Sequence, residues 1–418
     1  MCVITLTGVL IIRTVEMNTL PVPPPTYSEH YWYAEDDGRS GRARRAAASG
    51  PYRATIPAKI EHYTPTLSSA MAADLEEAAS TLTQFDTFAT EVLGGTASAV
   101  PMSAIMLRTE SASSSQIEQL TVGARQLALA EIDQSTSVNA KTVIGNVRAM
   151  QQAMEHNPPI DIESILAIHR TLLSHQDGWD HHAGRFRRQL VWVGSSGLGP
   201  RGATHIGPQP EFIEEAMFDL VAFMNRVDLP AILHVSIAHA QFETIHPFVD
   251  GNGRTGRVLI HSMLRNSGMV TGTSVPVSSG LLIDTPGYFE ALNSYRQGNA
   301  LPIVEKFTDA IRFASIQGKK LIQNLESQLI SDRDKLAHLR SNATAWQVLP
   351  WLIAHPVVNS NLLATVLGLS PVASQRALAQ LTESGILMER SGYKRNRVWQ
   401  HDQILEILDA YAETLRRA

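Results

Sequence analysis

The chain is built around the sequence His246-Pro-Phe-Val-Asp-Gly-Asn-Gly-Arg-Thr-Gly-Arg257, which gathers a histidine, a carboxylate, three glycines and two arginines into twelve residues. A helical pattern covers residues 231–245 before it, and Pro230 is suited to the first position of that helix. A second helix is predicted directly after it, over residues 258–265. The stretch therefore predicts a glycine-rich loop that ends where a helix begins.

Such a loop is suited to bind an anion. Glycine lets the backbone approach a ligand closely, and the first free N–H groups of the following helix point towards it from the positive end of the dipole. Arg254 and Arg257 are three residues apart, so both can reach one polyphosphate. Asp250 does not suit a pure anion site unless Mg²⁺ lies between it and the phosphates. His246, at the helix end, is placed to accept a proton.

These residues predict phosphate chemistry with Mg²⁺ and a histidine base. The loop is not a Walker A loop, because the sequence contains no G-x-x-x-x-G-K-[S/T]. The alternative interpretation is a turn between two helices that carries a few surface charges. A turn needs one or two glycines, however, rather than three interleaved with two arginines and an aspartate.

The stretch resembles the signature of Fic-domain proteins, HPF-x-[D/E]-GN-[G/K]-R-x-x-R, at every specified position. The resemblance implies a mainly α-helical protein with a Fic-type core that transfers a nucleotide monophosphate, usually AMP from ATP, to a hydroxyl side chain of a target protein. It implies that His246 is the general base for a Tyr, Thr or Ser hydroxyl and that Asp250 holds Mg²⁺ against the phosphates. Arg257 would bind the terminal phosphate, and a Gly rather than a Lys at position 253 favours nucleotidyl transfer. The anion hole would be lined by Gly251, Asn252, Gly253 and Arg254.

A serine cluster upstream, residues 111–118, has two interpretations. The first is a capping box, in which Ser115 begins a helix and Glu118 closes its first turn. The second is similar to the inhibitory helix of many Fic proteins, [S/T]-x-x-x-E-[G/N], with Ser114 and Glu118 in place and Gln119 at the last position. That resemblance implies that Glu118 pairs with Arg257 where the γ-phosphate of ATP would bind. Some relatives also use this glutamate to activate water and remove AMP, so a second activity is predicted as an option.

Two short segments that favour β-strands lie before the signature. Residues 190–193 and the return segment 205–210 resemble the β-hairpin flap of Fic proteins, which pairs with the target by strand addition, although a surface hairpin without a role fits the same pattern. After the signature, residues 275–282 and 288–292 are expected to close the nucleotide pocket. Tyr288 is the candidate for contact with the base, because leucines occupy the positions near 281 where relatives often place an aromatic residue.

The C-terminal residues 344–418 resemble a winged helix-turn-helix, with a third helix over residues 371–383 that Ser370 begins. The alternative is a protein-contact or dimerisation module, since that helix carries few charges. The side chains that would contact DNA phosphates and bases are Ser374, Gln375, Arg376, Lys394, Arg395 and Arg397.

Length and composition limit the number of domains and the classes of protein to which the chain can belong. A chain of 418 residues predicts two or three domains, and a net charge of −5 argues against extensive nucleic-acid coating. A single cysteine, Cys2, fits a reducing cytoplasm, and no apolar run reaches the eighteen or so residues of a membrane span. Residues 3–12 make a poor signal peptide, and translation from Met17 is an equal alternative to a start at Met1.

The predicted organisation has five parts, and two functions are compatible with it. The favoured one is a self-inhibited protein adenylyltransferase that uses ATP and modifies a target protein and itself. The alternative is a DNA-binding regulator whose Fic core senses a nucleotide, although a sensor needs no base such as His246. The parts are a mobile tail over 1–50, a helical region with the inhibitory helix over 51–140, the Fic core over 141–315, a helical connector over 316–343 and the winged helix over 344–418.

Overall fold

The computed structural model describes residues 19–36, 38–93, 99–155, 159–176, 178–195, 197–390 and 397–417. In this part the chain is mainly α-helical, and its strands form two antiparallel pairs and one three-stranded sheet. Cys2, residues 3–12, Met17 and the tip of the predicted wing at residues 391–396 lie outside the described residues.

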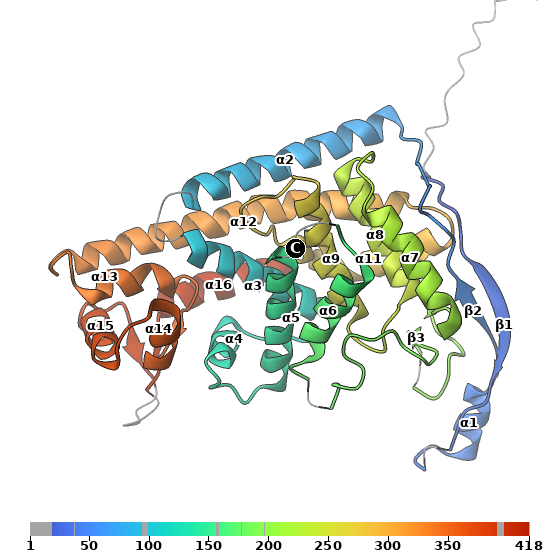
Figure 1. The fold of residues 1–418 in the computed structure, drawn as a ribbon, viewed down its shortest axis with the longest axis horizontal. Coiled ribbons are helices and arrows are strands. Elements are labelled where there is room, and N and C mark those ends of the chain that lie inside the picture. Colours follow the sequence, from blue (N-terminus) through green and yellow to red (C-terminus); the bar gives the residue numbers. More distant parts are fainter. Residues whose placement is uncertain are drawn as a thin grey trace, which may run out of the picture.

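The elements follow in this order along the chain (Figure 1). The helices are α1 (Arg42–Ala48), α2 (Ser69–Leu93), α3 (Ala99–Ile117), α4 (Ala124–Glu131), α5 (Val138–Glu155), α6 (Ile162–Leu173), α7 (Ile213–Met224), α8 (Ala231–Ile245), α9 (Asn252–Asn266), α10 (Val277–Ile283), α11 (Thr285–Arg296), α12 (Leu301–Leu336), α13 (Thr344–Val348), α14 (Ser360–Leu367), α15 (Pro371–Glu383) and α16 (Asp402–Arg417), with short 3₁₀ turns η1 (Pro210–Phe212) and η2 (Leu349–Leu352). The strands are β1 (Thr26–Trp32), β2 (Gly50–Ile56), β3 (Trp192–Val193), β4 (His205–Ile206), β5 (Val357–Val358), β6 (Met388–Glu389) and β7 (Trp399–Gln400).

Helix α8 lies at the centre of the core. Every residue after Ala231 in this helix is buried, which is the state expected for a helix that is apolar around most of its circumference. Helices α7, α9, α11 and α12 pack around it. The predicted bounds are confirmed, except that Pro230 is the N-cap rather than the first helical residue. His234 and His239, expected in the core, are both buried there.

Helix α12 is one continuous element of 36 residues that runs beside α2 along one side of the molecule (Figure 1). Its buried side chains recur along its whole length, from Ile303 to Leu336. Leu20 near the start of the described chain and Leu415 near its end belong to one hydrophobic cluster. Helix α12, which contains most of the predicted connector 316–343, thus packs on both the central helices and the C-terminal elements. The division into five parts stays a prediction.

The prediction of a mobile tail is wrong for residues 26–36 and 38–50. Strand β1 pairs antiparallel with β2, from Thr26 opposite Ile56 to Trp32 opposite Gly50, and α1 connects them. From Tyr27 to Trp32, exposed residues alternate with partly buried ones, as expected for a strand with one covered face. The neighbouring prolines and arginines obscured this strand in the sequence. Trp32 packs edge-on against Trp192 and donates a hydrogen bond to the carbonyl of residue 198, so the hairpin is held against the β3–β4 region.

The C-terminal elements include a helix pair, α14 and α15, bent by 113°, and the sheet order β5-β7-β6. The predicted start of α15 is confirmed, because Ser370 accepts a hydrogen bond from the Ala373 N–H. Ser374 is buried and cannot contact DNA, and Arg397 is paired with Glu389. Lys394 and Arg395 lie outside the described residues. The winged helix-turn-helix assignment stays a prediction.

Among the described residues, no single helix has both the length and the apolar character to cross a membrane, and by those two criteria alone one bent pair, α14 with α15, would.

Candidate active site

The signature stretch connects α8 to α9 through two residues in the left-handed region. His246 caps α8 with φ 50° and ψ 62°, and Gly251 caps the start of α9 with φ 76°. Residues other than glycine rarely adopt the left-handed backbone conformation of His246, so contacts with the surrounding residues must stabilise it. His246 and the α9 N-terminus line one cavity of about 900 Å³, and Arg254 and Arg257 line it as well.

His169 and Asn252 hold the signature loop through hydrogen bonds to its backbone. The Gly184 N–H donates to His169 Nδ1 at 3.0 Å, so Nε2 carries the proton and donates to the Asp250 carbonyl at 3.0 Å. Burial lowers the pKa of His169 to about 4, which keeps the ring neutral. The Asn252 amide bonds both backbone groups of Phe248. The side chain of Asn252 is thus used to shape the loop, and what it offers an anion is its backbone N–H in the first turn of α9.

Arg187 holds the same loop from the other side. Its buried guanidinium donates to the carbonyls of His246, Gln189 and Pro208, each at 2.8 Å. Its own N–H donates to the Pro247 carbonyl at 2.9 Å. Burial lowers the pKa of Arg187 to about 10, so it remains charged at neutral pH. Backbone dipoles rather than a carboxylate stabilise this charge.

We expect Arg187→Met to lower the free energy of unfolding by about 3 kcal/mol, because three buried carbonyls lose their donors. Denaturant unfolding followed by circular dichroism measures this. The neighbouring Arg188→Met is the matched control: Arg188 is exposed, so its change should stay within about 0.5 kcal/mol. Equal losses in both variants would contradict the role given to Arg187.

His246 has an acidic neighbour one helical turn earlier. Its Nδ1 lies 3.5 Å from Glu243 Oε2, and Glu243 is buried. Burial raises the pKa of Glu243, but His246 above all, with the charges of His239 and Arg257, outweighs this and brings it to about 2. The carboxylate is therefore charged at neutral pH and would stabilise a protonated His246.

Glu118 occupies both arginines of the signature. Its Oε1 accepts from Arg257 Nη2 at 2.7 Å, and its Oε2 accepts from Arg254 Nε at 2.9 Å. Arg257 also donates through Nε to the Ser114 hydroxyl and through Nη2 to the Ser114 carbonyl, each at 2.8 Å. The two arginine side chains are only 2% exposed, whereas Glu118 is 26% exposed. The predicted Glu118–Arg257 contact is present, and the contact with Arg254 was not predicted.

The serine cluster forms the end of α3 and not the start of a helix, so the capping-box interpretation is wrong. Gln119 has φ 64°, and the Leu120 N–H reaches back to the Ser115 carbonyl at 3.0 Å while the Gln119 N–H bonds the Gln116 carbonyl. This is a Schellman C-cap, whose left-handed position is usually Gly or Asn. A glutamine here completes the same turn at a conformational cost.

Asp250 fits a shared magnesium site. Its side chain is 39% exposed at the cavity, with Oδ2 bonded to Arg254 Nη2 at 3.0 Å. In the described part of the chain no group of three His, Cys, Asp or Glu side chains could hold a metal. Mg²⁺ commonly binds through one or two carboxylates with phosphates and water as its other ligands, and Asp250 can supply one.

Tyr288 lines the cavity but is almost fully buried. Its hydroxyl lies 2.6 Å from His239 Nε2, and burial raises the pKa of the phenol well above its ordinary value. Tyr288 therefore forms part of the cavity wall, behind Arg257, and its ring is not free to stack on a base. Leu281 is buried in the core and does not line the cavity.

Comparison with known proteins agrees with this geometry. Residues 159–264 match the model of the Fic/DOC family. This part of the chain is similar to Fic domains. The curated relatives include Protein adenylyltransferase Fic of Nematostella vectensis, 31% identical over 155 residues, which are 36% of this chain and 32% of that protein. The protein of the same name from Drosophila mojavensis is 30% identical over 196 residues, 44% and 36% of the two chains. The chain thus spans about a third of the length of these relatives.

The fold is also similar to that of a solved structure. A Fic family protein from Desulfovibrio desulfuricans G20 aligns with a TM-score of 0.51 and 22% identity, over 80% of this chain and 97% of that chain. The likeness concerns the fold.

Three residues that shape the candidate site were not predicted from the sequence. Glu243 could have been found, because a carboxylate three residues before His246 on one helix shares its face. His169 and Arg187 could not, since their partners lie 81 and 59 residues away and no local pattern marks them.

Proposed function

We propose that this protein transfers AMP from ATP to a Tyr, Thr or Ser hydroxyl of a target protein. The observation that carries the proposal is the convergence of His246, Asp250 and two buried arginines on one cavity. The relatives named as protein adenylyltransferases support the same reaction. A nucleotide sensor needs the arginines but has no use for a base paired with Glu243.

In the proposed reaction the hydroxyl oxygen forms a bond to the α-phosphorus of ATP. The bond from that phosphorus to the oxygen leading to the β-phosphate breaks, and pyrophosphate leaves. The proton passes to His246, whose Nδ1 faces Glu243 and whose Nε2 is then the nitrogen available to the substrate. Glu243 orients the ring and stabilises its charged form.

The negative charge of the phosphates is met by the start of α9 and by the arginines. The free N–H groups of the first turn and the guanidinium groups of Arg254 and Arg257 already lie at the cavity, so little further reorganisation is required once Glu118 has left the arginines. Asp250 would hold Mg²⁺, which when bound neutralises part of the phosphate charge.

Self-inhibition by Glu118 is part of the proposal. The carboxylate occupies Arg254 and Arg257, so a γ-phosphate cannot bind there while α3 keeps its present position. Gly253 supports this, because a Cβ at that position would lie 2.4 Å from Glu118 Oε1. The glutamate and the start of α9 are thus in direct contact.

The β3–β4 hairpin is the proposed docking edge for the target. Trp192 pairs with Ile206 and Val193 with His205, and in the described structure this sheet has two strands. An extended target segment would lie alongside this hairpin and pair with it by strand addition. Val193 is 41% exposed, and Trp192 lines the cavity that contains His246.

The alternative, a DNA-binding nucleotide sensor, finds less support. Of the predicted DNA contacts, Ser374 is buried, Arg397 is paired with Glu389, and Arg376 is an exposed cation on α15. Helix α16 instead packs against α4, α10 and α12. These contacts favour a C-terminal part that supports the core.

The test is transfer of radiolabel to protein from ATP labelled either at the α- or at the γ-phosphate, with Mg²⁺ present and a cell lysate as a source of targets. The proposal expects label from the α-position only. Label from the γ-position would indicate phosphorylation, and no label from either, even after removal of Glu118, would favour the sensor.

The left-handed conformation of Gln119 should weaken the inhibition by Glu118. Gln119→Gly removes the cost of a left-handed side-chain residue, about 0.5–1 kcal/mol, and should favour the inhibited form. Basal transfer should fall by about two- to fivefold. Gln119→Ala keeps the Cβ and serves as the control. Basal transfer that rises in the glycine variant would contradict this account of the turn.

A further inference from the structure

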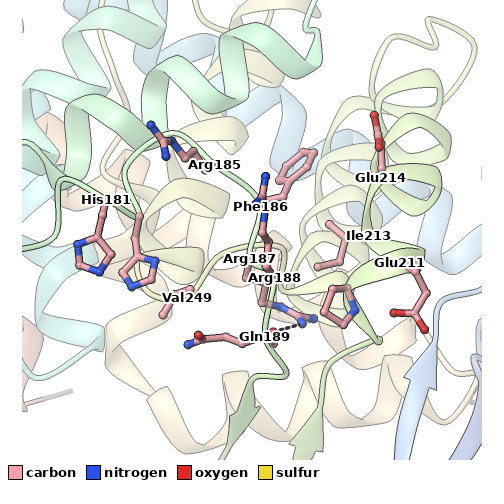
Figure 2. A pocket seen from close by; sticks show the side chains of 12 residues that line it. His181, Arg185, Phe186, Arg187, Arg188, Gln189, Glu211, Ile213, Glu214 and Val249 are labelled. Carbon is pink, nitrogen blue, oxygen red and sulfur yellow. Dashed lines mark hydrogen bonds between the residues drawn. The ribbon is translucent and has the colours of Figure 1, made fainter.

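A second groove, of about 710 Å³, lies beside the active site (Figure 2). One wall is the segment that leads into the β3–β4 hairpin and carries Arg185 and Arg188. The other wall is the turn η1 with Glu211 and the start of α7 with Glu214. In Figure 2, Arg185 lies on one side of the segment around Phe186 and the two glutamates lie on the other.

The charges of this groove are not neutralised within the protein. Arg185, Arg188, Glu211 and Glu214 make no ion pair or side-chain hydrogen bond with any other residue that the structure describes. Neighbouring charges do pair, as Lys59 does with Glu215. All four side chains are exposed, and their signs are separated by wall. A ligand with a negative group therefore fits the arginine wall and is repelled from the other.

The groove is continuous with the catalytic loop. Val249, three residues after His246, lines both the groove and the active-site cavity. Arg187 lines the groove and donates a hydrogen bond to the His246 carbonyl at 2.8 Å. Both walls also flank the hairpin in sequence, one before β3 and one after β4. One extended segment can thus reach His246 and the groove together, since each residue advances about 3.3 Å.

We propose that this groove contributes to the choice of target. Arg185 and Arg188 bind an acidic side chain about two to four residues from the modified hydroxyl. The inference rests on the proposed AMP transfer and adds the chemical class of the target segment. Arg185 and Arg188 act on specificity and take no part in the transfer chemistry. The favourable charge pairing raises the rate with acidic targets over neutral and basic ones.

The experiment uses synthetic 11-residue peptides with a central Tyr, Thr or Ser and with Asp, Asn or Lys at one flanking position at a time. Enzyme with Glu118→Gly is compared with the same enzyme carrying Arg185→Glu and Arg188→Glu. We expect an acidic peptide to be preferred over its Asn version by about three- to tenfold in kcat/KM, and the double reversal to transfer that preference to the Lys version.

The control is Lys320→Glu with Arg333→Glu, a reversal of equal charge on α12, which lines neither cavity. It should leave the preference unchanged, and transfer to the Asn peptide reports that each variant is folded. A preference that survives the groove reversal, or no preference for charge, overturns the inference. If no peptide and no protein is labelled, the proposed reaction fails instead, and fluorescence anisotropy of the labelled Asp and Lys peptides still decides whether the groove binds acidic segments.

Discussion

Replacement of Glu118 by glycine should raise automodification by about 100-fold. The wild-type carboxylate accepts hydrogen bonds from two arginines that are nearly inaccessible to water, where charged pairs are stronger than on the surface. Holding activity near 1% requires a preference for the inhibited form of only about 2.7 kcal/mol. Two such contacts, with Ser114 bound to the same arginine, are sufficient.

The measurement is incorporation of label from α-labelled ATP into the protein itself. Two controls separate charge from local loosening of α3. Glu118→Gln keeps the shape and removes the charge, so it should release most of the activity. Gln116→Gly weakens the same helical turn but leaves the carboxylate, and it should release little. Equal labelling of wild type and Glu118→Gly would contradict self-inhibition by the Glu118 carboxylate.

Features that depend on local interactions could be predicted from the sequence, whereas most contacts between distant residues could not. Helices α8 and α15 have the predicted bounds because their apolar residues and the residues at their starts are local signals. The contact of Glu118 with Arg257 was found through a motif that pairs distant residues, and it is present across a separation of 139 residues. Its extension to Arg254 follows from the position of α3 in space, which no spacing along the chain encodes.

The errors have the same origin. Residues 111–118 were ambiguous because a serine and a glutamate three apart suit the start of a helix as well as its end, and the packing of α3 on α5 and α10 decides between them. The hairpin β1–β2 was not predicted, because Trp32 packs on Trp192, which lies 160 residues further along the chain. No local pattern indicates such a contact. Arg187 is the clearest case, since a buried arginine bound only to carbonyls has no charged partner to look for.

His246→Ala should lower AMP transfer by about 10²- to 10⁴-fold in a Glu118→Gly background, where the nucleotide site is open. A general base contributes this much when it takes the proton in the transition state. ATP affinity should change little, because in the proposed reaction the start of α9 and its arginines bind the phosphates and His246 does not. Retained transfer would show that another group accepts the proton, and lost ATP binding would show that the loop had collapsed.

Glu243→Gln separates the orientation of the base from its presence. The pKa of Glu243 is about 2, so at neutral pH the wild-type protein places a full negative charge 3.5 Å from His246 Nδ1. The amide keeps the shape and removes the charge that stabilises the imidazolium. We expect transfer to fall by about tenfold, with KM for ATP unchanged and kcat reduced. In a protein that already carries His246→Ala, the same substitution should have no further effect, because a group that acts through the histidine has nothing left to act on. Additive losses in the double variant would instead place Glu243 in the stability of α8 and outside the reaction.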